Sequence, residues 1–226
     1  MGNYISVAID GPSGAGKSTV AKAVAKQFGC LYVDTGAIYR TVGLAAQKAG
    51  LDSRDAAGVV ALLPSISVDI TYDADGTQAM LLGGEDVSAE IRTPKSSLYA
   101  SDISTVPEVR AFLLEMQREM ARKHDVIMDG RDIGTVVLPD AQVKVFLTAS
   151  AEARARRRCQ ELKEKGMETP FDEVLRDIEY RDRQDSARAA APLKAAEDAV
   201  TVDSSGLTFA ETVEAVGALI RRKTGR

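Results

Sequence analysis

Eight consecutive residues near the start of the sequence have the types and spacing of a phosphate-binding loop. Gly11-Pro12-Ser13-Gly14-Ala15-Gly16-Lys17-Ser18 fits the pattern G-x-x-x-x-G-K-[ST], between a strand-like run, Ile5–Asp10, and a helical run, Ser18–Phe28. In such a loop the glycines let successive backbone N–H groups turn toward phosphate oxygens, and the helix N-terminus adds partial positive charge. Lys17 can reach the β- and γ-phosphates, and the Ser18 hydroxyl can enter the Mg²⁺ shell. The loop therefore predicts a site for a nucleoside triphosphate.

Carboxylates end most of the strand-like runs. The five runs are Ile5–Asp10, Leu31–Asp34, Val126–Asp129, Val143–Leu147 and Val200–Asp203, and four of them end in aspartate. Because the carboxyl ends of parallel strands share one edge, beside the crevice where ligands bind, this edge is the expected functional one. Asp129 could hold a metal-bound water as the second element of a P-loop site, but an aspartate that only begins a turn fits the same pattern. Asp10 is open to the same two interpretations.

Arginines are the candidate ligands of a second phosphate group. They occur at three separated places in the sequence: Arg40, Arg131, and the pair Arg181 and Arg188. Arg181, Asp185 and Arg188 fall at i, i+4 and i+7, on one helix face. Val174 and Ile178 continue the same stripe toward the N-terminus. The stripe indicates a helix that runs from the core into a polar cleft. An exposed i,i+4 ion pair is the alternative interpretation.

The lack of a well-placed base narrows the choice of acceptor. A sugar hydroxyl would need a group that takes its proton, whereas a phosphate monoester, with a second pKa of ~6, is already mostly ionised. His124 is the only histidine and lies at the end of a charged helical run. The many arginines and this single histidine favour a phosphate acceptor, although a carboxylate base would suit a hydroxyl. The only asparagine, Asn3, excludes the guanine-reading Asn-Lys-x-Asp pattern.

The elements that must position these residues alternate between strand and helix. This alternation predicts an α/β protein with a parallel sheet built from βαβ units. The pattern changes between Thr41 and Met120, where Ser67–Tyr72 and Gln78–Leu82 flank a turn and predict an antiparallel hairpin. Pro107 opens a helix, and residues 150–191 are helical and densely charged. An insertion of this kind usually forms a second lobe that closes over a site.

The composition excludes several other classes of protein. The 226 residues carry 29 basic and 33 acidic side chains, a net charge of −4, with 5% aromatic residues and no tryptophan, which gives little support to nucleic-acid binding. Cys30 and Cys159 provide neither a disulfide framework nor a cysteine zinc site. No apolar run approaches the ~20 residues of a membrane span, and no signal peptide precedes the first strand-like run. We therefore expect a cytoplasmic protein without a membrane partner.

Taken together, the motifs resemble one known family, the bacterial cytidylate kinases, which have the nucleoside-monophosphate kinase fold. The similarity runs nearly end to end, and the order and spacing of its blocks are more specific than any single block. The blocks are Ile9–Thr19, Asp34–Arg40, Gly84–Ser88 with Ile91-Arg92, Asp129–Val137, and Arg181-Asp182 with Asp185–Arg188 and Ala191–Leu193.

The resemblance implies a three-layer P-loop fold with a five-stranded parallel sheet, an inserted hairpin-containing lobe and a helical lid. We expect one domain, residues 1–226, whose core comprises about 1–40, 121–150 and 190–226. The lobe that binds the monophosphate would span about 41–120, and the lid about 154–172. The implied reaction transfers the γ-phosphoryl group of ATP to CMP or dCMP, giving CDP or dCDP, with Mg²⁺ as the cofactor. A monomer is the implied assembly.

Site residues carry over where this sequence matches the family motifs. Lys17, Arg131 and Arg188 would be catalytic, and Ser18 and Asp129 would hold Mg²⁺, the latter through water. ATP would contact the loop, Gly11 to Thr19, and three arginines of the following charged stretch, namely Arg154, Arg157 and Arg158. Arg156 is left out because adjacent residues on a helix point in different directions. The monophosphate would contact Thr35, Tyr39, Arg40, Ser101, Arg110, Arg131, Asp132, Arg181, Asp185 and Arg188.

The resemblance also assigns roles within this acceptor set. Arg40, Arg131 and Arg188 would clamp the phosphate, while Arg181 and Asp185 would contact the sugar; cytosine would be read by Ser101, Arg110 and Asp132. Cytosine presents an N4 amino donor, which a carboxylate can accept, whereas uracil presents a carbonyl there. That mismatch costs about 1–3 kcal/mol. Ser101 has an alternative as a cap near the helix that Pro107 opens.

Two other functions fit the phosphate-binding loop. One is a small P-loop kinase that acts on another monophosphate or on a small hydroxyl acceptor. The other is a regulatory module that binds ATP without transferring its phosphate to a nucleotide. A panel of acceptors distinguishes all three functions.

Overall fold

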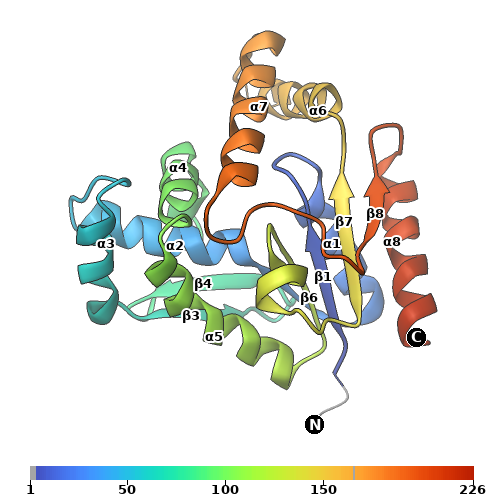
Figure 1. Ribbon diagram of the computed structural model, residues 1–226, viewed down its shortest axis with the longest axis horizontal. Helices are drawn as coiled ribbons and strands as arrows, with labels where there is room; N and C mark the ends of the chain where they lie inside the picture. The colour runs from blue at the N-terminus through green and yellow to red at the C-terminus, as the bar shows by residue number, and fades with distance from the viewer. Residues whose placement is uncertain (1–3, 165) are drawn as a thin grey trace.

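A five-stranded parallel sheet forms the centre of the computed structural model, which describes residues 4–164 and 166–226 (Figure 1). Its strand order is β2-β6-β1-β7-β8. The strands are β1 (Ser6–Asp10), β2 (Leu31–Asp34), β6 (Val126–Gly130), β7 (Val143–Thr148) and β8 (Val200–Asp203). The prediction of five parallel strands is confirmed, and all of them lie within residues 1–40, 121–150 and 190–226.

Helices cover both faces of this sheet because its strands are apolar on both sides. On one face Ile9 and Ile127 pack with α1 and α8, and on the other Met128 packs with α2 and α5, where Ile38 and Leu113 are fully buried. The fold is therefore three-layered, as expected. The helices of the described residues are α1 (Lys17–Phe28), α2 (Thr35–Lys48), α3 (Ala56–Leu62), α4 (Pro94–Ile103), α5 (Pro107–Lys123), α6 (Ala151–Glu164), α7 (Phe171–Ala187) and α8 (Phe209–Thr224).

A second, antiparallel sheet lies in the segment between Thr41 and Met120. It comprises β3 (Val68–Tyr72), β4 (Gln78–Leu82) and the short β5 (Glu85–Asp86), in that order. The predicted hairpin is confirmed, because β3 pairs with β4 from Val68–Leu82 to Tyr72–Gln78. Met80 and Ile103 are fully buried and belong to the same apolar cluster as Ile38 of α2. The inserted segment therefore shares a core with the main sheet.

Helices α6 and α7 form a hairpin that stands beyond the carboxyl ends of the strands (Figure 1). Ala155, Val174 and Ile178 form a small apolar cluster of their own between these two helices. The same face of α7 continues to Asp185, whose side chain is also buried. The predicted stripe that runs from apolar residues into a polar site is thus confirmed for Val174, Ile178 and Asp185. Arg181 is exposed.

Asp10 holds a turn that the sequence did not predict. Residues Ile133–Val137 form a single π-helical turn after β6. The two carboxylate oxygens of Asp10 accept from the backbone N–H groups of Ile133 and Gly134, both at 2.7 Å. Asp10 is therefore a structural anchor between the end of β1 and this turn. Burial raises its pKa to about 6 despite the two hydrogen bonds.

No helix within residues 4–164 and 166–226 is both long enough and apolar enough to cross a membrane.

The raised pKa of Asp10 predicts a pH dependence of stability. Between about pH 4 and pH 6 the folded protein binds this proton more readily than the unfolded chain, so stability rises on acidification through this range. Asp10→Asn lacks this contribution. On going from about pH 7 to about pH 5, the unfolding free energy of the wild type should gain about 1 kcal/mol relative to Asp10→Asn, measured by urea denaturation. Parallel pH profiles would contradict the assignment.

Candidate active site

The loop between β1 and α1 packs tightly against the neighbouring strand β7. Gly11 has φ +150°, and a Cβ at this position would lie 1.9 Å from the carbonyl oxygen of Leu147 in β7. Gly16 caps α1 in the left-handed conformation, with φ 84°. Both positions therefore require glycine, as a phosphate-binding loop does. The helix begins directly at Lys17, so its free N–H groups face the loop.

Lys17 is buried within this loop, and its Nζ donates a hydrogen bond to the carbonyl oxygen of Pro12 at 2.8 Å. Burial lowers the pKa of Lys17 below its ordinary value, and the charge of Arg131 lowers it further. Asp129 and Asp10 act in the opposite direction. The ammonium is thus held in place by the loop itself and lacks a directly bonded counter-charge among the described residues.

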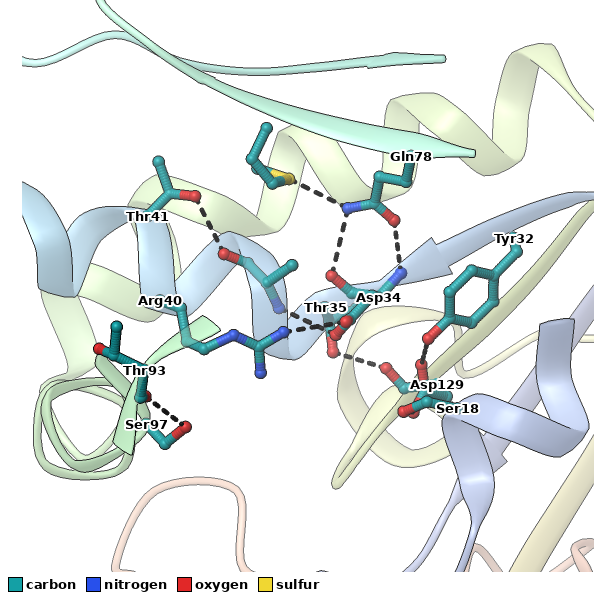
Figure 2. A network of polar contacts seen from close by, with 12 residues as sticks. Ser18, Tyr32, Asp34, Thr35, Arg40, Thr41, Gln78, Thr93, Ser97 and Asp129 are labelled. Carbon is teal, nitrogen blue, oxygen red and sulfur yellow. Dashed lines mark hydrogen bonds and ion pairs between the residues drawn. The ribbon is translucent and has the colours of Figure 1, made fainter. Parts of the chain in front are cut away.

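Asp129, next to the last residue of β6, is held by the side chains of three other residues. Ser18 Oγ donates to Oδ2 at 2.9 Å and Tyr32 OH donates to Oδ1 at 2.8 Å (Figure 2). The hydroxyl of Thr35 donates to the backbone carbonyl of Asp129 at 2.7 Å, and β1 pairs alongside. Burial raises the pKa of Asp129, and the neighbouring carboxylate of Asp34 raises it further.

The pair Ser18 and Asp129 fits a magnesium ion. Mg²⁺ usually keeps several waters and is bound by one or two carboxylates together with substrate phosphates, so a cage of protein ligands is not required. The described residues contain no cluster of three or more acidic, histidine or cysteine side chains arranged for a metal. One hydroxyl and one oriented carboxylate beside the phosphate-binding loop match the first type of site.

A cleft of about 790 Å³ opens above the loop. Lys17, Ser18 and Asp129 line its floor, and Leu207, which lies between β8 and α8, and Phe209, the first residue of α8, line its outer part. Phe209 is 53% exposed, an unusual position for a large apolar side chain. The cleft thus combines a floor suited to phosphates with an apolar rim suited to an aromatic ring.

A second cleft, of about 440 Å³, adjoins the first. The structure brings together in its lining all ten residues predicted to contact the monophosphate. The two clefts share Ser13, Gly36, Arg40, Gly130 and Arg131, so they meet along one wall. Arg40 and Arg131 are the charged members of that wall.

Carboxylates pair with the arginines of the second cleft. Arg40 Nη2 lies 2.9 Å from Asp34 Oδ2, and its Nε is buried without a hydrogen-bond partner within the described part of the chain. Asp185 binds Arg131 Nε at 2.8 Å and also pairs with Arg188. Burial lowers the pKa of Arg188, while Asp185 counteracts this effect. Asp185 thus joins two of the three predicted clamp residues.

The residues predicted to read a base lie at the far end of the same cleft. Asp132 is buried and forms an ion pair with Arg110, whose guanidinium carbon lies 5.7 Å from the ring centre of Tyr39. Ser101 lies in α4, two residues before its end. It does not cap α5, because that helix begins after Val106 without a side-chain cap. The capping alternative for Ser101 is therefore wrong.

The structure separates the three arginines predicted to contact ATP. Arg154 is buried beneath the loop, where its guanidinium donates to the carbonyl oxygen of Ser13 at 3.0 Å and pairs with Asp182 at 2.6 Å. Arg157 lines the first cleft and bonds to Ser204. Arg158 is exposed and pairs with Glu161. Among the described residues, the lining of the first cleft includes neither Arg154 nor Arg158.

Arg156, which the helix argument left out, does line the first cleft. Leu207, Phe209 and Tyr32 were also missed by the sequence analysis. Phe209 follows Thr208, the N-cap of α8, so its place at a helix start beyond the last strand was a usable signal. Tyr32 gave no such signal, because its contact with Asp129 joins residues far apart in the sequence.

Comparison with known proteins identifies relatives along nearly the whole chain. The family model for cytidylate kinase matches residues 7–222. A cytidylate kinase from Caldicellulosiruptor saccharolyticus is 48% identical over 98% of this chain and 97% of its own length. One from Geobacter sp. is 50% identical over 98% of this chain and 94% of its own length.

A solved structure of an uncharacterized protein from Eubacterium ventriosum has the same fold, with a TM-score of 0.51. The alignment covers 98% of this chain and 99% of that chain at 11% identity, so it supports the fold alone. The family assignment rests on the sequence matches, which include the phosphate-binding loop and the residues that line both clefts. This chain belongs to the cytidylate kinase family.

Proposed function

We propose that this protein transfers the γ-phosphoryl group of ATP to CMP or dCMP, giving CDP or dCDP. The observation that carries this proposal is the wall shared by the two clefts, where Arg40 and Arg131 lie between the loop and the acceptor residues. A triphosphate on the loop and a monophosphate in the second cleft would meet at these arginines. The reacting groups would thus be brought together in one position, which is the main contribution an enzyme makes to phosphoryl transfer.

The acceptor needs cations rather than a base. A nucleoside monophosphate is mostly ionised at neutral pH, so its oxygen can attack without losing a proton. Arg40, Arg131 and Arg188 bind its phosphate, since all three line the second cleft. Lys17 and Arg131 stabilise the negative charge on the transferred group. The anion replaces Asp185 or Asp34 as the partner of these guanidinium groups.

Ser18 and Asp129 would hold Mg²⁺, the carboxylate through a bound water. When bound, the ion neutralises charge on the donor phosphates. Tyr32 and Thr35 fix the side chain and the backbone of Asp129, so its carboxylate keeps one orientation. Arg157 and Arg156 line the route by which the rest of ATP reaches the loop, and Leu207 and Phe209 offer an apolar contact for its base.

Cytosine is read at the far end of the second cleft. Asp132 accepts from the N4 amino group, Arg110 donates to the acceptor edge of the ring, and Ser101 lies beside both in the lining. Arg181 and Asp185 contact the sugar. The ion pair between Asp132 and Arg110 keeps both side chains in place before the base arrives, which reduces the ordering that binding requires.

The two peripheral parts of the fold close this site. Residues about 41–120 form the lobe that binds the monophosphate, and residues about 154–172 form the lid over ATP. Closure excludes water, which would otherwise compete with the acceptor for the phosphoryl group. Arg154 would serve as the root of the lid, because it is bonded to the loop at Ser13. We further propose that the protein acts as a monomer, since one chain supplies the lining of both clefts. The cytoplasm is its proposed location.

The choice of acceptor tests the proposed function. Mg·ATP with CMP or dCMP should give fast ADP release, UMP weak release, and AMP or GMP none, with nucleotide products resolved by chromatography. Asp132→Ala should reduce the ratio of kcat/KM for CMP over UMP about tenfold, because it removes the acceptor for the N4 amino group. Asp86→Ala, an exposed aspartate of β5, is the matched control and should leave the ratio unchanged.

Activity on another monophosphate would support a nucleotide kinase but reject the role of Ser101, Arg110 and Asp132 in recognising cytosine. ATP binding without transfer to any acceptor would reject the kinase and favour the regulatory module.

A further prediction of the proposed function concerns the proton on Lys17. Because the pKa of this lysine is lowered in the free protein, phosphate groups bound beside it should raise that pKa again. ATP binding should then take up protons between neutral pH and the ordinary lysine pKa of about 10.4. Titration calorimetry in buffers of different ionisation enthalpy measures this uptake. Lys17→Arg keeps the charge but cannot lose its proton, so the uptake should vanish; equal uptake in both proteins would contradict the assignment.

A further inference from the structure

Strand β2 leaves part of its backbone outside the main sheet. It is an edge strand, paired on one side only, with β6. In a strand the backbone N–H and C=O groups of alternate residues point to opposite sides, so those of Tyr32 and Asp34 face away from β6. Such edge groups need other partners, because unpaired backbone groups are costly when buried.

Two side chains of the β3–β4 hairpin supply these partners. Gln78 Oε1 accepts from the backbone N–H of Asp34 at 2.7 Å, and its Nε2 faces the carbonyl oxygen of Asp34 at 3.4 Å (Figure 2). Tyr72 OH donates to the carbonyl oxygen of Tyr32 at 3.0 Å. Within the described residues, these contacts are the hydrogen bonds that join the hairpin to β2. The amide of Gln78 thus takes the place of one peptide group of a neighbouring strand.

Asp34 connects the Gln78 amide to residues that line the second cleft. Its Oδ1 accepts from the N–H of Ala37 and caps α2, and its Oδ2 pairs with Arg40. The next residue, Thr35, bonds to the backbone of Asp129 and lines the second cleft. Any rotation of the Asp34 peptide would therefore move both Thr35 and Arg40. Figure 2 shows Gln78 at the backbone of Asp34 and Arg40 at its carboxylate.

The contact between the hairpin and β2 borders a groove on one side. A groove of about 520 Å³ separates the hairpin from α1 and β2, and Gln78, Asp34 and Arg40 all line it. Although it lines this groove, Gln78 is only 9% exposed, and its Nε2 also contacts Met80 Sδ at 3.0 Å. This contact within the hairpin holds the Gln78 amide in place, and the Asp34 peptide depends on that amide for its hydrogen bonds.

We propose that Gln78 is a positioning residue for the phosphate clamp, acting through the Asp34 peptide on Thr35 and Arg40. The inference rests on the proposed function, since it assigns Arg40 to the acceptor phosphate. Gln78 touches neither nucleotide. It sets the affinity for the monophosphate, and it links the inserted lobe to the site by a defined hydrogen bond in addition to the shared apolar core.

The test is a comparison of Gln78→Met with Tyr72→Phe. Methionine keeps the length and apolar stem but cannot hold the Asp34 peptide, so KM for CMP should rise about fivefold to tenfold. KM for ATP and kcat should stay within about twofold, because the lost binding is uniform between ground state and transition state. Tyr72→Phe removes the other tether of the same hairpin and should leave KM for CMP unchanged. Gln78→Glu is a second variant and should also raise KM for CMP, because one oxygen faces the carbonyl of Asp34.

Two further measurements separate positioning from general loosening of the hairpin. The amide proton of Asp34 should lose hydrogen-exchange protection in Gln78→Met and keep it in Tyr72→Phe. In an Arg40→Met background, Gln78→Met should raise KM for CMP by less than it does in the wild type, because the part of its effect that passes through Arg40 is already lost.

Three results would overturn the inference: an unchanged KM for CMP in Gln78→Met, an equal rise in Tyr72→Phe, or additive effects with Arg40→Met. A wild-type protein that does not phosphorylate CMP would instead reject the proposed function.

Discussion

The need to pair charges at the carboxyl edge of the sheet governs the site. Arginines and aspartates crowd this edge, and several are too buried for water to screen them, so an unpaired charge would be costly. The structure resolves this by pairing Arg40 with Asp34, Arg110 with Asp132, and Asp185 with both Arg131 and Arg188. These pairs therefore order the arginines that we propose as the phosphate clamp before any ligand arrives. In the proposed function an incoming phosphate would exchange one anionic partner for another, which would limit the desolvation that binding must overcome.

The same constraint explains why the fold needs parts far apart in the sequence. Asp34 and Asp129 lie opposite each other in neighbouring strands. Burial raises the pKa of Asp129, and the like charge of Asp34 raises it further. Ser18 and Tyr32 hold the carboxylate of Asp129, while Gln78 holds the backbone of Asp34. Loop, sheet and hairpin each contribute one of these groups. The inserted segment is thus joined to the edge of the main sheet through a shared core and specific hydrogen bonds.

Local patterns in the sequence predicted the parts that depend on local physics. The loop, the five strands and the β3–β4 hairpin follow from periodicity and turn residues, and the ten acceptor residues meet in one cleft as the resemblance implied. Contacts across the fold could not be read in this way. The bond from Tyr32 to Asp129 spans 97 residues and that from Asp34 to Gln78 spans 44. Likewise, helical direction alone could not show that Arg154 turns under the loop while Arg156 and Arg157 face the first cleft.

Calorimetric titration of the free protein with CMP, cytidine and UMP tests the central claim most directly. If the arginines form a clamp for a phosphate and Asp132 reads the base, CMP should bind at least about 100-fold more tightly than cytidine, which lacks the anion that replaces the carboxylates. UMP should bind about tenfold more weakly than CMP because Asp132 would face a carbonyl. Equal affinity for cytidine and CMP would contradict the clamp, and equal affinity for UMP and CMP would contradict the reading of the base.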